Sequence, residues 1–347
     1  MAMTLIQIYF FCYVLSLKDC VKFSPIFLGM FYGMLSITTL LQDGDLAEVC
    51  LQNTKPWSLD SAGKETMAKI KTESAFWTVF VIVNLGLALI AAILFVLPVT
   101  HDEDVFFAVY FFDKYFFDYA SVLIWIYKST FFIVAFMMVN CSHLFLYGIQ
   151  QIIFQKYLLV THLVNLTNVV QYNSEDNSSL LKNEHYQMEV ENRIKFCIKK
   201  HVEIISASSA GVKKLRKWIP LFALNGILLF ICCTFYCFLN EDNPKGIYYR
   251  VGAICIVGLT TFCSLAFIGQ RVENESDLLL RINTEIRWTS LNRKNLNLLT
   301  IMSIVMKTPL TLKFSDNLII NYAVGLRIVK VVYTVLCFLV QMKNFLR

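Results

Sequence analysis

The sequence predicts an all-α membrane protein that crosses the bilayer seven times, with its N-terminus inside the cell. Hydrophobic residues make up 57% of the 347-residue chain and charged residues 16%, whereas a soluble protein carries roughly 25% charged residues. Apolar runs of about 20 residues, long enough to cross a bilayer, recur along the chain. Lys and Arg gather in the segments that follow even-numbered runs, and this bias predicts the orientation.

The first three spans are predicted from apolar runs near the N-terminus. Residues 4–17 form a short run, which we interpret as a first span, S1, whose start is missing or unusually short. A signal peptide is the alternative interpretation. Residues 22–42 and 76–98 are the spans S2 and S3, joined by a loop over 43–75. The segment after Pro98 is acidic and aromatic, which is typical of a membrane interface.

A nearly unbroken helical pattern from 119 to 170 is too long for one crossing. We expect it to contain the span S4 and to project into the aqueous phase as a helix. The segment 188–218 places apolar residues at helical spacing on one face. A stripe of this kind more often packs on protein than lies on a membrane.

Three further spans are predicted in the C-terminal part: S5 over 219–239, S6 over 247–270 and S7 over 317–343. S6 continues as an amphipathic helix to about 288, and another such helix covers 291–307. S7 carries Arg327, Lys330 and Gln341 within its apolar run. Because lipid tolerates such residues poorly, we expect S7 to line a wet space.

The charge of the loops predicts the orientation. The segments after S4 and S6 are rich in Lys and Arg, whereas the segment after S3 has five acidic residues against Lys114 alone. By the positive-inside rule, the even-numbered loops are cytoplasmic. The N-terminus is then inside and the C-terminus outside, which is opposite to a G-protein-coupled receptor.

Metal and nucleic-acid chemistry have no support in the sequence. The cysteines lie mostly in apolar segments, where they act as small hydrophobic residues. No two of the five histidines lie three to five residues apart, so we expect no metal, no cofactor and no enzyme. A transporter or intramembrane enzyme would need a cluster of acidic or metal-binding residues within spans, and S3 and S5 contain no Asp, Glu, Lys, Arg or His. The net charge of +6 is spread over loops and does not indicate a nucleic-acid partner.

The C-terminal half resembles the insect odorant receptors, a family of ligand-gated cation channels with inverted seven-span topology. The segment 197–205 resembles the family's helix before S5. The other matching residues are Gly269, Ser276, Trp288, Arg293, Lys294, Pro309, Leu310, Leu312, Lys330, Tyr333 and Gln341. The related gustatory receptors end in a Thr-Tyr pair followed by Gln-Phe, and here Val335 and Met342 replace the Tyr and the Phe. The odorant receptors are therefore the better match.

The resemblance implies an odorant receptor subunit of a ligand-gated non-selective cation channel, tuned to small volatile ligands. The alternative is a gustatory receptor that forms a homomeric channel. The implied partners are an obligate co-receptor subunit, in a hetero-oligomer that is expected to be a tetramer, a volatile odorant and the lipid bilayer. The implied location is the plasma membrane of olfactory neuron dendrites.

The resemblance places the pore in the last span. Phe338 and Met342 are four residues apart and share a helical face, with Gln341 beside them. In a tetramer they would form an apolar gate, and the amide of Gln341 would meet a partly dehydrated cation. Ordinary packing is the alternative role for Phe338 and Met342. We expect three parts: 1–187 with S1–S4 on the ligand-binding side, 188–316 with S5, S6 and the cytoplasmic anchor helices, and 317–347 as the pore-lining S7.

The ligand pocket is expected among the outer halves of S2, S3, S4 and S6, as in the family. An apolar odorant needs an aromatic cavity with few polar groups. The candidate residues are Phe27, Met30, Phe31, Ile90, Leu94, Tyr127, Phe131, Tyr248 and Tyr249. A residue of this kind is more often an ordinary core residue than a ligand contact.

Overall fold

The computed structural model describes residues 2–14, 16–43, 63–99, 102–168, 176–239, 245–307, 313–315 and 318–346. This part of the chain is almost entirely helical. The α-helices are α1 (Ala2–Tyr13), α2 (Leu17–Asp43), α4 (Gly63–Val96), α5 (Phe107–Tyr115), α6 (Ala120–Val164), α7 (Asn177–Lys182), α8 (Glu184–Leu215), α9 (Ile219–Leu239), α10 (Lys245–Glu285), α11 (Arg293–Met306) and α12 (Tyr322–Leu346). The short elements are the 3₁₀ turns η2 (Asp102–Asp104) and η4 (Trp288–Ser290) and the strands β1 (Lys313–Ser315) and β2 (Leu318–Ile319).

Six helices of the described residues are long and apolar enough to cross a membrane: α2, α4, α6, α9, α10 and α12. They confirm an all-helical, multi-pass membrane protein. The predicted span S1 corresponds to α1, which has 12 residues and is shorter than the roughly 20 that cross a bilayer as a straight helix. It packs through Phe10 on Phe107 and Phe111 of α5, and through Phe11 on Phe27 of α2.

Two predicted boundaries are wrong. Residues 63–75 were expected in a loop but form the first part of α4, because Lys, Glu, Met and Ala favour helix even where an apolar pattern is missing. The last helix was expected from Asn317 but begins at Tyr322. Asn321 caps it by accepting a hydrogen bond from the backbone N of Val324 at 3.0 Å, and the antiparallel strands β1 and β2 precede the cap.

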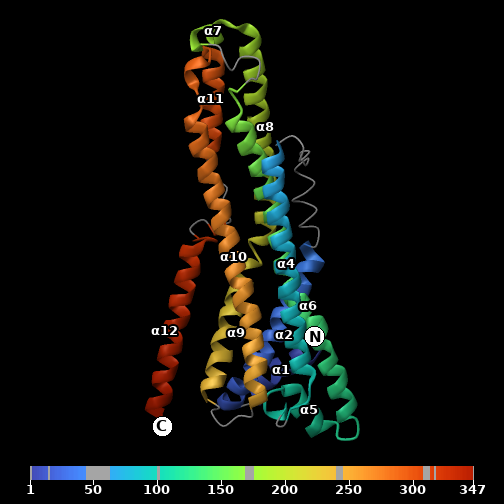
Figure 1. Cartoon of the computed structure of the whole chain (residues 1–347). Coiled ribbons are helices and arrows are strands. Elements are labelled where there is room, and N and C mark those ends of the chain that lie inside the picture. Colours follow the sequence, from blue (N-terminus) through green and yellow to red (C-terminus); the bar gives the residue numbers. More distant parts are fainter. Residues whose placement is uncertain are drawn as a thin grey trace.

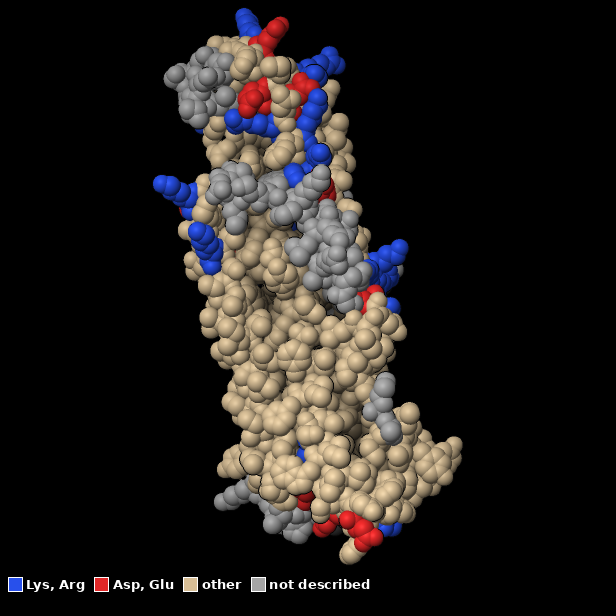
Figure 2. Space-filling model, turned by 90° about the vertical axis from the view of Figure 1, so that its right-hand side faces the viewer, with Lys and Arg blue, Asp and Glu red and all other residues tan. Residues whose placement is uncertain are grey.

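The helices form one elongated bundle (Figure 1). The membrane helices gather at one end, while α7, α8, α11 and the last part of α10 form the other. Lys and Arg concentrate toward this second end, and a broad band of uncharged residues covers the face below it (Figure 2). This distribution is the one expected if the end with α7 and α11 is cytoplasmic.

Two apolar clusters fill the bundle, with a polar layer between them. The first cluster joins α6, α8, α10 and α11, and the second joins α5 to parts of α2, α4, α6, α9 and α10. Between them, Asn84 of α4 is buried and its amide N donates to Nε2 of His143 on α6 at 3.0 Å. Its amide O accepts from Thr260 of α10 at 2.9 Å. These bonds hold three helices in register.

Gln187 of α8 joins the elements at the cytoplasmic tip. Its amide N donates to the carbonyls of Ser290 at 2.7 Å and Leu180 at 3.0 Å. Its amide O accepts from the backbone N of Asn292 at 3.0 Å and from the side chain of Asn295 at 2.8 Å. One buried side chain thereby connects α7, α8, η4 and α11.

The start of α12 is fastened to α10 at Gly269. A Cβ atom added there would lie 2.2 Å from the carbonyl O of Ile320, so the close approach requires glycine. Beside this contact, Asn321 donates to Glu273 at 3.2 Å, and the backbone N of Tyr322 donates to Gln270 at 3.3 Å. Beyond this attachment, α12 diverges from the bundle toward its C-terminal end (Figure 1).

Replacing Gly269 by Ala tests this attachment. The new methyl group collides with the backbone of Ile320, so α10 and the start of α12 must separate, at a cost of about 1–3 kcal/mol. We expect a lower melting temperature of the purified protein. Gly258→Ala is the matched control, because it lies in the same helix and its Cβ meets nothing within 4 Å. A melting temperature of Gly269→Ala equal to that of the control would contradict the contact.

His201 of α8 predicts sensitivity to acid. It is 4% exposed, and burial, followed by the charge of Lys156, lowers its pKa from 6.5 to about 4. The unfolded chain therefore binds the proton first. The neutral side chain of His201 contributes roughly 3 kcal/mol to the free energy of unfolding. This contribution is complete above pH 6.5 and is lost as the pH falls to about 4.

The measurement is the melting temperature of the purified protein at pH 7.5 and at pH 5. We expect His201→Gln to lose less stability on acidification than the unchanged protein. His185→Gln serves as the control because His185 is an exposed residue of the same helix. An equal loss in all three proteins would show that His201 is not responsible.

Candidate functional site

Two of the predicted ligand residues lie in a buried aromatic cluster. Tyr127 and Phe131 of α6 pack ring to ring, with centroids 5.4 Å apart. Phe106, which precedes α5 and is fully buried, contacts both rings at 6.5 and 5.7 Å. Phe95 of α4 stacks on Phe131 at 5.5 Å. We call Phe95, Phe106, Tyr127 and Phe131 the aromatic cluster.

Three predicted residues lie on α2 at the edge of this region. Phe27 stacks on Phe31 with centroids 6.3 Å apart, and its other ring contact is with Phe11 of α1. Met30 packs against the apolar cluster that contains Phe95 and Tyr127. Met30 therefore adjoins the larger apolar cluster to which the aromatic cluster belongs, while Phe27 and Phe31 form a separate stack.

The other four candidates differ in exposure. Leu94 is half-buried next to Phe95, and Tyr248 is also half-buried. Ile90 and Tyr249 are 54% and 67% exposed in the single chain. These two side chains are not brought to the aromatic cluster, and their role in ligand binding stays a prediction.

A buried charged group beside the aromatic cluster was not predicted. Arg250 at the start of α10 donates from Nη1 to Asp102 at 2.6 Å, from Nε to the carbonyl of Leu94 at 2.7 Å and from Nη2 to the carbonyl of Leu97. Lys128 of α6 pairs with the second carboxylate oxygen of Asp102. We call Asp102, Lys128 and Arg250 the charged cluster.

The charged cluster connects α4, α6, α10 and η2 at the outer end of the bundle. Its side chains are 12%, 7% and 1% exposed for Asp102, Lys128 and Arg250, respectively. The available signal in the sequence was the presence of a Lys and an Arg within or next to apolar runs, together with the acidic segment after Pro98. Nothing in the spacing of these residues indicated that they meet.

The predicted pore residues lie on the diverging part of α12. Phe338 is 59% exposed and Gln341 is also exposed in the single chain, while the side chain of Met342 lies outside the described residues. Leu326, Val329 and Tyr333 are exposed as well. This largely apolar surface needs lipid or another subunit to cover it.

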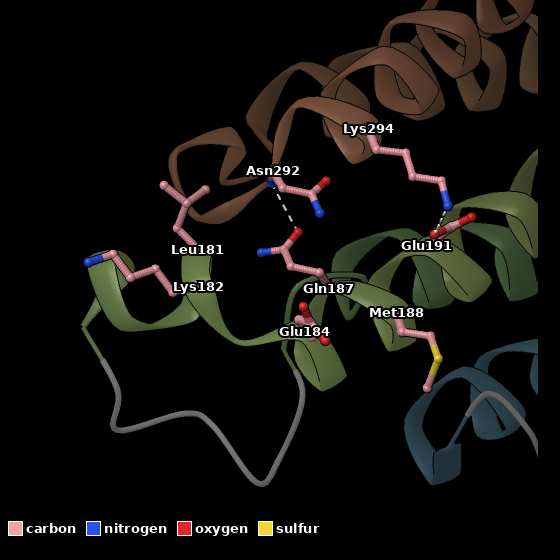
Figure 3. A pocket seen from close by; sticks show the side chains of 8 residues that line it. All are labelled: Leu181, Lys182, Glu184, Gln187, Met188, Glu191, Asn292 and Lys294. Carbon is pink, nitrogen blue, oxygen red and sulfur yellow. Dashed lines mark hydrogen bonds and ion pairs between the residues drawn. The ribbon is translucent and has the colours of Figure 1, made fainter.

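A pocket at the cytoplasmic tip has a different character (Figure 3). It is lined by Leu181, Lys182, Glu184, Gln187, Met188, Glu191, Asn292 and Lys294. Lys294 pairs with Glu191 at 2.8 Å across it. The charged lining does not suit an apolar volatile molecule, and α7, α8 and α11 lie at the opposite end from α5 (Figure 1). Among the described residues, no group of His, Cys, Asp and Glu could hold a metal ion.

Comparison with known proteins identifies the fold. No family model and no curated protein matches the sequence. The structure of the insect olfactory receptor OR5 from Machilis hrabei in complex with eugenol matches with a TM-score of 0.70 and 12% identity, over 95% of this chain and 84% of that chain. Another structure of the same receptor matches with a TM-score of 0.66 and 10% identity, over 95% and 83%. Both are receptors and not enzymes, and this chain has the fold of an insect olfactory receptor.

Proposed function

We propose that this chain is the odorant-binding subunit of a ligand-gated, non-selective cation channel. The observation that carries the proposal is the likeness to an olfactory receptor over 95% of the chain. The course of α12 supports it, because this apolar helix is fastened to α10 at one end and leaves most of its surface for other subunits or lipid. The expected location is the plasma membrane of olfactory neuron dendrites.

The three parts of the chain then have separate tasks. Residues 1–187 carry most of the ligand-binding side, 188–316 hold S5, S6 and the anchor helices, and 317–347 line the pore. For the ligand we favour the aromatic cluster, because it is buried, lies between α4, α5 and α6, and contains two of the residues predicted for this role.

Assembly with a co-receptor is assigned to the cytoplasmic helices. At the polar end of the bundle, α8 exposes Phe196 and Val202, and α11 exposes Ile301 and Ile304. Burial of such apolar side chains against an apolar surface of a partner lowers the free energy, because it removes them from water. We infer that these helices contact the co-receptor in a hetero-oligomer, which we expect to be a tetramer.

Recording odorant-evoked current tests the proposed function. We expect cells that express this chain with the co-receptor to pass monovalent cations and calcium in response to some members of a broad odorant panel. Cells with the co-receptor alone are the control. Current from this chain expressed alone would favour the gustatory alternative, a homomeric channel. No current across the panel, with surface expression confirmed, would overturn the proposal.

The apolar gate is tested with Phe338→Ala. A smaller side chain widens the constriction and makes it easier to wet, so we expect the resting current without odorant to rise several-fold. Leu326→Ala, an exposed apolar residue near the other end of α12, is the matched control. A resting current that Phe338→Ala leaves unchanged, at equal surface expression, would remove this residue from the gate.

A further inference from the structure

Among the described side chains, the charged cluster holds two cations and one carboxylate. Arg250 and Lys128 are both within ion-pair distance of Asp102, and among the side chains that the structure describes no other carboxylate pairs with either cation. Two positive groups thus share one negative group, and the side chains of Asp102, Lys128 and Arg250 are only 12%, 7% and 1% exposed. Burial of an uncompensated charge is strongly unfavourable. The site therefore favours an additional anion.

Lys128 is the cation with hydrogen-bonding capacity left over. The carbonyls of Leu94 and Leu97 and the carboxylate of Asp102 accept from Arg250. The ammonium of Lys128 has three N–H donors, and Asp102 is its acceptor among the described residues. The ring of Phe106 also lies beside the ammonium, with its centroid 5.6 Å from Nζ. Up to two donors of Lys128 are thus available to a ligand.

An aromatic ring lies beside the ammonium of Lys128. Phe106 contacts Lys128 and also the rings of Tyr127 and Phe131. An anion bound at Lys128 would therefore have aromatic rings next to it. A molecule with a charged head and a short apolar tail matches this arrangement better than an inorganic anion, because the tail covers the rings and leaves the head on the ammonium.

We propose that the site takes small organic carboxylates, such as short-chain fatty acids. The carboxylate accepts hydrogen bonds from Lys128 Nζ, and the hydrocarbon tail packs on Phe106, Tyr127 and Phe131. Arg250 and Asp102 form the fixed ion pair that holds α10 and η2 beside the site. This inference rests on the proposed function, because it names the ligand class of the odorant-binding subunit.

The test compares hexanoate, methyl hexanoate and hexanamide at pH 7.4, where the acid is ionised. The chain without substitutions is expressed with the co-receptor. We expect the concentration of hexanoate that evokes half-maximal current to be about 10-fold to 100-fold lower than that of either neutral compound. This difference corresponds to the free energy of a charge-assisted hydrogen bond. Lys128→Met should abolish this preference, so that hexanoate becomes no more potent than the two neutral compounds. Formate, a carboxylate without a tail, should not activate.

Two substitutions of Lys128 should preserve the fold. Lys128→Met removes the excess charge and leaves Arg250 and Asp102 as a neutral pair, so the protein should fold at least as well. Lys128→Arg keeps the charge and should keep the preference for hexanoate. Equal potency of hexanoate and methyl hexanoate in the unchanged chain, or a preserved preference in Lys128→Met, would overturn the inference.

A second measurement does not depend on channel activity. Hexanoate should raise the melting temperature of the purified protein more than methyl hexanoate does, since a ligand that binds the folded state stabilises it. The difference should disappear in Lys128→Met. Stabilisation by hexanoate without current would support the site and contradict the proposed function. Current in response to neutral odorants alone, without stabilisation by hexanoate, would contradict the site and support the proposed function.

Discussion

The register of this helical bundle depends on a few polar contacts in an apolar interior, above all those of Asn84 with His143 and Thr260. In lipid, helices gain little by burying apolar side chains against one another, because the lipid is equally apolar. Polar pairs and close backbone contacts therefore determine how helices align. Asn84 supplies both donor and acceptor, and it stands where the two apolar clusters separate. The alignment of α4, α6 and α10 follows from it.

Helix α10 connects the candidate sites. Arg250 near its start belongs to the charged cluster, Thr260 belongs to the polar layer and Gly269 receives the start of α12. Its last part contributes to the cytoplasmic end of the bundle. A ligand that shifts the outer end of α10 therefore acts on the helix to which α12 is fastened. The proposed binding site and the proposed pore share one structural element.

The exposed surface of α12 fits the proposed assembly with other subunits. Gly325 and Val332 face the bundle, whereas Leu326, Val329, Tyr333 and Phe338 are exposed. Arg327 and Lys330 are exposed too, which would be unfavourable if lipid surrounded the helix on all sides. A wet pore, or other subunits around α12, would remove this difficulty. Helices α8 and α11 also expose apolar side chains at the other end of the bundle.

The amino-acid sequence by itself determined the fold class, six of the membrane helices and the charge distribution along the axis. These three features depend on the length and charge of local apolar segments. Both properties are visible in the sequence without knowledge of what each segment contacts. The helical start of α4 was missed because it carries no apolar pattern. The start of α12 and the strands before it were missed because caps and hairpins depend on single residues such as Asn321. Only the tertiary structure brought Asp102 to Lys128 and Arg250, which are 26 and 148 residues away in the chain. No local sequence pattern predicts this contact, because it follows from the packing of α4, α6 and α10. The same packing decided which predicted ligand residues, Tyr127 and Phe131 among them, lie together in the interior.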